Sequence, residues 1–242
     1  MKPQLKFTGG GAMTGLIIVD EVSGFAVAGG GNLAPPIENA QVTRIIDGTD
    51  RLARCFTAQD WPIFAFLDTQ EPGKPKPPYP LHYEARSGEE ELVDQLKWFE
   101  GDANATLVRK DCINGFIGVI GSDGRNAVVD WANRTGVRDL FVVGICADIC
   151  VMDFVLTMLS ARNHAMMPRC ETVSVHEGVC ATYDLPREAA ESLGLPATSS
   201  HPQELSHHMG LYCMAARGAR ILSEVEVAVY RGRDNAMRKP LR

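Results

Sequence analysis

The chain has 242 residues, of which 45% are hydrophobic and 22% charged, which indicates a globular protein that can bury one sizeable core. Its net charge of −6 argues against nucleic acid or an anionic membrane as the main partner, because both bind basic surfaces. Seven irregularly spaced cysteines without a CxxC pair, and no secretory signal segment, favour an intracellular, cytoplasmic protein with reduced thiols.

Short apolar runs bounded by turn residues predict four strands buried on both faces of a sheet: GLIIVD (15–20), PIFAFLD (62–68), ATLVRK (105–110) and DLFVVGI (139–145). Helical patterns separate and follow them, at about 37–60, 89–100, 125–136, 150–163 and 203–217. Strands that alternate with helices predict an α/β fold, a three-layer α/β/α sandwich with a mostly parallel central sheet. The proline-rich segment EPGKPKPPYP (71–80) is expected to be a loop.

Reactive side chains stand at the carboxyl ends of the predicted strands, where open α/β sheets form their sites. Asp20, Asp68 and Lys110 end three of the runs, and Cys150 follows the fourth at the start of a predicted helix. Each residue alone could be a turn residue, a cap, a solvated strand end or a core cysteine. Together, an acid, an amine and a thiol at one sheet edge indicate a nucleophile with its activators.

The chemistry of this group predicts amide hydrolysis through a thioester. The thiolate is the attacking form of a cysteine, and both a helix N-terminus and a nearby ammonium favour it. A carboxylate can take the thiol proton and deliver it to the leaving amine. Backbone N–H groups of the turn before the helix would face the developing oxyanion.

Six segments of the chain carry a family resemblance: GLIIVDEVSGF, GNLAPP, RKDCINGFIG, GICADICVMDFV, LSARNH and HPQELSHHMGLY. With these segments the chain resembles the isochorismatase-like cysteine hydrolases, and among them the nicotinamidases of land plants. The resemblance implies hydrolysis of nicotinamide to nicotinate and ammonia in NAD salvage, and self-association as a homo-oligomer. It also implies one domain over residues 1–242, with a core of about 14–229, a flexible N-terminus and a basic C-terminal tail.

The resemblance implies a catalytic triad of Asp20, Lys110 and Cys150. It further implies an oxyanion hole formed by the backbone amides of Cys146 and Cys150. A cis peptide bond between Ile145 and Cys146 is expected next to that oxyanion hole. In this interpretation Cys150 is the nucleophile, and Cys146 contributes its backbone rather than its thiol.

The resemblance also implies substrate and metal ligands, and here the sequence departs from the pattern. Phe25 and Tyr79 would form aromatic walls for a planar substrate. Relatives of this kind hold a divalent metal through an Asp-x-His pair and a later His, but here Gln70 replaces the first His and leaves Asp68 and His82. Two protein ligands are few for a tight site, so zinc, manganese or magnesium on this pair is the weaker expectation. No organic cofactor is expected.

The glutamine at position 70 leaves a second function open. Metal-free relatives act on ureido or carbamoyl compounds, and for such a substrate Gln70 would be a substrate-facing amide. A third interpretation is a degenerate, non-catalytic relative. Retention of the acid, the amine and the thiol at positions 20, 110 and 150 argues against decay.

Overall fold

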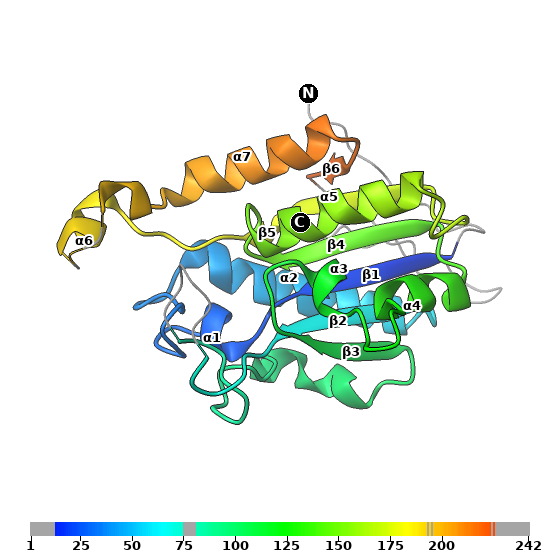
Figure 1. The fold of residues 1–242 in the computed structure, drawn as a ribbon, viewed down its shortest axis with the longest axis horizontal. Coiled ribbons are helices and arrows are strands. Elements are labelled where there is room, and N and C mark those ends of the chain that lie inside the picture. Colours follow the sequence, from blue (N-terminus) through cyan, green and yellow to red (C-terminus); the bar gives the residue numbers. More distant parts are fainter. Residues whose placement is uncertain (1–12, 75–80, 193, 195, 224, 226–242) are drawn as a thin grey trace, which may run out of the picture.

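The fold is built on one central sheet, seen in a computed structural model that describes residues 13–74, 81–192, 194, 196–223 and 225 (Figure 1). Six strands lie in the order β3-β2-β1-β4-β5-β6, and every neighbouring pair is parallel. The α/β prediction is confirmed, and the sheet of the described residues is parallel throughout rather than mostly parallel. None of the described helices is long and apolar enough to cross a membrane.

The four predicted strands are present with bounds that differ by at most one residue at either end: β1 Thr14–Val19, β2 Ile63–Asp68, β3 Ala105–Lys110 and β4 Asp139–Ile145. Two further strands were not predicted, β5 Thr172–Ala181 and β6 Arg220–Leu222. The sequence of β5 carries His, Glu and Gly in its middle, which interrupts the apolar run, and β6 has only three residues. Both strands form because the sheet supplies their hydrogen-bonding partners.

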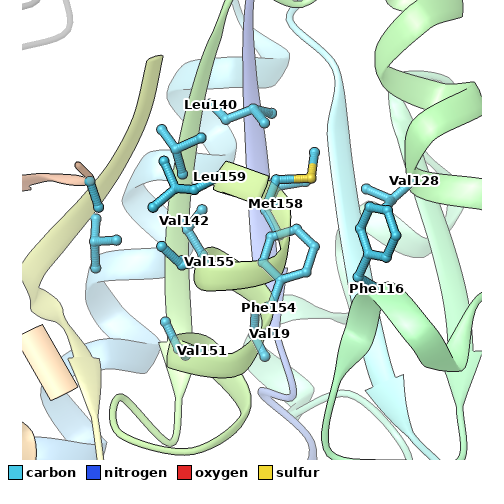
Figure 2. Packing of buried hydrophobic residues seen from close by; sticks show 14 of the residues in the cluster. Val19, Phe116, Val128, Leu140, Val142, Val151, Phe154, Val155, Met158 and Leu159 are labelled. Atoms are coloured by element: carbon cyan, nitrogen blue, oxygen red, sulfur yellow. The ribbon is translucent and has the colours of Figure 1, made fainter. Parts of the chain in front are cut away.

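Helices cover the two faces of the sheet (Figure 1). Their bounds are α1 Ser23–Ala26, α2 Ala40–Thr57, η1 Asp94–Gly101, α3 Gly115–Gly118, α4 Ala127–Thr135, α5 Cys150–Asn163, α6 Arg187–Ser192, η2 Ala197–Ser199 and α7 Gln203–Ala216. Helices α4, α5 and α7 pack in one apolar cluster, and α1, α2 and η1 in the other. Strand β1 supplies alternate side chains to both, Ile17 to the first and Leu16 to the second. Figure 2 shows Phe154 and Val155 of α5 against Val142 of β4.

A side-chain cap explains where α2 begins. The Asn39 side chain accepts hydrogen bonds from the backbone N–H groups of Gln41 and Val42, so α2 starts at Ala40 rather than at residue 37. Helix α5 has the predicted bounds.

The helix predicted over 89–100 is wrong, because only the 3₁₀ helix η1 forms, from Asp94. The carbonyls of Glu89 and Glu91 accept hydrogen bonds from the backbone N–H groups of Gly24 and Ser23 instead of from a following helical turn. Of the loop predicted over 71–80, residues 75–80 lie outside the described part, and 71–74 form a turn.

Candidate active site

Three neighbouring strands bring an ammonium between two carboxylates at their carboxyl ends. Lys110 pairs in register with Asp68 across β2 and β3, and Asp20 follows β1 directly. The Lys110 Nζ lies 2.9 Å from Asp20 Oδ2 and 3.1 Å from Asp68 Oδ2. All three residues are buried. Because an unpaired charge in a buried site is costly, the two carboxylates need the Lys110 ammonium to stay ionised there.

Cys150 joins Asp20 and Asp68 at this edge of the sheet from the segment that follows β4. Cys150 is the first residue of α5, and its Sγ and one oxygen each of Asp20 and Asp68 lie within 4.8 Å of one another. A tight turn between β4 and α5 sets this position. In that turn the Ile145–Cys146 peptide bond is cis, and the backbone N–H groups of Ile149 and Val151 each donate to the Cys146 carbonyl at 3.1 Å.

A glycine allows the turn to approach β1. Gly144 has a φ of +126°, and a Cβ at this residue would lie 2.1 Å from the Val19 carbonyl oxygen. No side chain fits there without moving the backbone of β1. The turn that presents Cys150 therefore depends on Gly144.

Burial controls the protonation of this group. It raises the pKa of Asp20 to about 7, which the Lys110 ammonium opposes and the Asp68 charge reinforces. Burial also raises the pKa of Cys150 well above its usual value, although Lys110 lowers it. Burial alone would lower the pKa of Lys110, but the negative charges of Asp20, Cys150 and Asp68 outweigh it and raise that pKa.

The expectation that the helix and the ammonium favour the thiolate of Cys150 stays a prediction. Lys110 does lower the pKa of this thiol, but burial raises that pKa and is the larger cause. Asp20, with a pKa near neutrality, is the group that can accept this proton as the thiol attacks. The arrangement is suited to nucleophilic attack coupled to proton transfer.

The aromatic side of the site differs from the expectation. Phe25 of α1 is buried, and its ring lies 4.2 Å, between centroids, from the ring of Tyr83. Tyr79 lies outside the described residues. Tyr83 was missed, since a lone tyrosine beside His82 in a loop carries no periodic signal. Burial is the main cause that raises the pKa of its phenol, and the charges of Cys146, Asp68, Cys150 and Asp20 add to it.

The metal ligands named from the sequence, Asp68 and His82, are both buried, but the donors of this site fit a metal poorly. Gln70 donates a side-chain N–H to Asp68 Oδ1, and Lys110 occupies Oδ2. The three described side chains whose donor atoms lie close enough to share an ion are Asp20, Asp68 and Cys150. An ion there would face the Lys110 ammonium and occupy the atoms that the reaction needs.

Comparison with known proteins gives the family. Residues 14–189 match the model of the isochorismatase domain. The chain is 47% identical over 211 residues to Nicotinamidase 1 of Arabidopsis thaliana, covering 87% of this chain and 86% of that protein. The chain belongs to the isochorismatase family.

Solved structures share the fold. The nicotinamidase PncA of Bacillus subtilis superposes with a TM-score of 0.65 at 17% identity, over 87% of this chain and 99% of that one. The pyrazinamidase of Pyrococcus horikoshii, solved in complex with zinc, gives a TM-score of 0.60 at 19% identity, over 87% and 98% of the two chains.

Proposed function

We propose that this protein hydrolyses nicotinamide to nicotinate and ammonia, with Asp20, Lys110 and Cys150 as its catalytic residues. One observation carries the proposal: these three side chains meet in one buried site, in a chain 47% identical to a plant nicotinamidase. The second carboxylate of the site, Asp68, holds Lys110 from the opposite side. The one-domain organisation over residues 1–242 is part of this proposal.

The first half of the reaction forms a thioester. The Cys150 sulfur attacks the carboxamide carbon while its proton moves to Asp20. The negative oxygen that results faces the backbone N–H groups of Cys146 and Cys150, the latter at the first position of a helix, where N–H groups have no intrahelical partner. The tetrahedral intermediate collapses, the C–N bond breaks, and Asp20 returns the proton to the departing ammonia.

The second half hydrolyses the thioester. A water molecule attacks the same carbon and gives a proton to Asp20, the C–S bond breaks, and the sulfur of Cys150 recovers that proton. Nicotinic acid then leaves and loses its proton to the released ammonia, so the products in solution are nicotinate and ammonium. Lys110 stays an ammonium throughout, because its raised pKa keeps the proton, and it balances the charge of the carboxylates.

A divalent metal on Asp68 and His82 stays a prediction, and no step of this mechanism passes through it. If bound, such an ion would polarise a substrate atom or a water molecule. The engagement of both Asp68 oxygens by Gln70 and Lys110 argues against tight binding.

Self-association also stays a prediction, and α7 offers support for it. Leu205, Met209 and Tyr212 recur at helical spacing on this helix and are 59%, 45% and 60% exposed. An apolar stripe of this kind suits contact with a second copy of the chain. Sedimentation of the purified protein, with and without Leu205→Glu and Met209→Glu, tests this.

The function is tested by ammonia release from a panel of amides that includes nicotinamide and a carbamoyl amino acid. We expect nicotinamide to be the preferred substrate and Cys150→Ala to abolish its turnover, with unchanged far- and near-ultraviolet circular dichroism. Cys213→Ala on α7 is the matched control and should retain activity. Preference for the carbamoyl compound, or turnover by Cys150→Ala, would contradict the proposal.

A further inference from the structure

A buried hydroxyl in the site has no partner among the described residues. Tyr83 is 0% exposed, and its hydroxyl is one of the few buried side-chain polar atoms without a hydrogen bond. A buried hydroxyl left unpaired costs about 1–3 kcal/mol. Tyr83 belongs to the site by its contacts, since its ring packs on Phe25 and its carbonyl accepts from the backbone N–H of Gln70. A buried donor without a partner next to a candidate active site is suited to bind a ligand.

The backbone on both sides of Tyr83 holds the ring in place. Its N–H donates to Glu89 Oε2 at 2.9 Å, and its carbonyl accepts from the Gln70 N–H at 2.8 Å. The residue has a φ of +47°, a conformation that is uncommon for a bulky side chain and needs such support. Phe25 packs against one face of the ring, and Gly24 lies so close that a Cβ there would be 2.5 Å from ring carbons.

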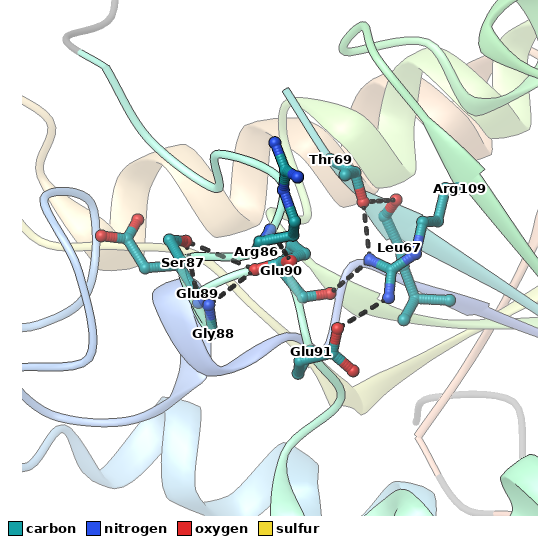
Figure 3. A network of polar contacts seen from close by, with 9 residues as sticks. All are labelled: Leu67, Thr69, Arg86, Ser87, Gly88, Glu89, Glu90, Glu91 and Arg109. Carbon is teal, nitrogen blue, oxygen red and sulfur yellow. Dashed lines mark hydrogen bonds and ion pairs between the residues drawn. The ribbon is translucent and has the colours of Figure 1, made fainter. Parts of the chain in front are cut away.

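Hydrogen bonds and an ion pair also hold the loop over residues 86–91, as Figure 3 shows. Glu90 accepts hydrogen bonds from the backbone N–H groups of Arg86 and Gly88. The Arg109 guanidinium of β3 donates to the Glu90 carbonyl at 3.2 Å and to Glu91 Oε1 at 2.8 Å. The loop that anchors Tyr83 through Glu89 is thereby tied to the sheet, so the hydroxyl cannot easily turn to find a partner.

Nicotinamide has a polar atom that requires a donor. Its ring nitrogen is unprotonated at neutral pH and carries a lone pair in the ring plane, so burying it without a hydrogen bond is unfavourable. Two other side-chain donors of the described site are already used: Lys110 pairs with two carboxylates, and the Gln70 amide N–H donates to Asp68. The hydroxyl of Tyr83 is a buried donor of this site that has no partner among the described residues.

We infer that Tyr83 donates a hydrogen bond to the ring nitrogen of the substrate and so selects pyridine carboxamides over plain aromatic amides. This inference rests on the proposed function and replaces the metal as the group that holds the nitrogen. Phe25 packs on Tyr83 and restricts the orientation of the Tyr83 ring. Gln70 is a positioning residue, because its amide fixes the orientation of Asp68.

The test compares nicotinamide with benzamide, which has the same shape and a C–H in place of the ring nitrogen. Chelated wild type, with its metal content checked by elemental analysis, should prefer nicotinamide. Tyr83→Phe should lower kcat/KM for nicotinamide about 10- to 100-fold, mainly through KM, and change that for benzamide by no more than about twofold. Tyr212→Phe on α7, where the ring is 60% exposed, is the matched control and should alter neither.

A second measurement needs no variant of Tyr83. Calorimetric binding to the chelated Cys150→Ala chain should show nicotinamide binding at least about tenfold tighter than benzamide. Equal affinities, an unchanged substrate ratio in Tyr83→Phe, or loss of the ratio on chelation of wild type would each overturn the role of Tyr83 and leave the proposed function standing. Wild type without any activity on nicotinamide would overturn both.

Discussion

At the scale of single residues, the site is a balance between burial and charge. One ammonium, Lys110, pairs with two carboxylates, and the nearby thiol of Cys150 is buried with them. Burial raises the pKa of Asp20 to about 7 and that of Cys150 further. Burial therefore brings the pKa of the proposed base close to neutral pH and disfavours the thiolate of the proposed nucleophile.

The pH dependence of the reaction should report the pKa of Asp20. Below about pH 7 this carboxyl is protonated and cannot accept the thiol proton, so kcat/KM should fall with falling pH along a limb centred near that value. Asp20→Asn should lose the limb and about 10²- to 10⁴-fold in rate. Steady-state kinetics from pH 5 to 9 measure both. A wild-type limb that persists unchanged in Asp20→Asn would assign it to another group.

Position 70 decides how well the site can hold a metal. Gln70→His should remove the amide that binds Asp68 and supply a third donor beside Asp68 and His82. We expect zinc content to rise towards one per chain, because three protein ligands and a water complete a tetrahedral site. Elemental analysis after dialysis against zinc measures this, with Gln95→His on the exposed side of η1 as control. Equal zinc content in wild type and Gln70→His would show that Gln70 is not what prevents binding.

At the scale of elements, the turn between β4 and α5 positions Cys150, the proposed nucleophile. Polar contacts hold this turn from outside: Asp148 accepts from the Thr182 hydroxyl at 2.6 Å and pairs with His201 Nε2 at 2.8 Å. Burial would raise the pKa of Asp148, but its hydrogen bonds to His201 and Thr182 lower it below the usual value. Tyr183 stacks on the His201 ring at 3.8 Å between centroids. The segment before α7 thus braces the turn.

Gly144→Ala tests how strictly that turn is built. The new Cβ would overlap the Val19 carbonyl, and the φ of +126° is unfavourable for alanine. We expect a loss of at least about 3 kcal/mol in the free energy of unfolding, together with loss of activity. Gly101→Ala is the control, because a Cβ at that residue would have nothing within 4 Å, and it should change stability by no more than about 0.5 kcal/mol. Urea denaturation measures both, and equal losses would contradict the steric argument.

At the scale of the whole molecule, two apolar clusters on either side of the sheet isolate its polar edge from water. Glu21, next to Asp20 in the sequence, is fully buried and accepts a hydrogen bond from the Thr49 hydroxyl of α2. Burial raises its pKa to about 8, so it is neutral in the folded protein at physiological pH. In the unfolded chain the same group ionises above about pH 4.5.

This difference makes stability depend on pH. Between about pH 4.5 and 8 the unfolded state binds fewer protons at Glu21, so the group favours unfolding by up to about 1.4 kcal/mol more for each pH unit. Glu21→Gln removes the titration, and its stability relative to wild type should therefore rise from pH 5 to 7.5. Urea denaturation at both pH values measures the difference. A constant difference would show that Glu21 is already ionised in the fold.

Local sequence patterns were enough to predict the framework of the sheet. The apolar runs of β1, β2 and β4 are buried as predicted, whereas β3 is an edge strand and is only partly buried. The side of the sheet where Asp20, Asp68 and Lys110 lie was also predictable, because parallel strands end at the same edge. The start of α5 at Cys150 was predictable from the change in hydrophobic periodicity, because strands and helices repeat at different intervals.

Features that depend on residues distant in the sequence became visible only in the folded chain. Strand β5 forms because β4 and β6 flank it, and the segment from residue 89 stays a loop because its carbonyls bond to α1. The raised pKa values of Cys150 and Asp20 follow from desolvation, which cannot be derived from the spacing of residues in the sequence. The unpaired hydroxyl of Tyr83 likewise appears only when the chain closes around it. Burial is a property of the whole fold, and the chemistry of this site is set by burial.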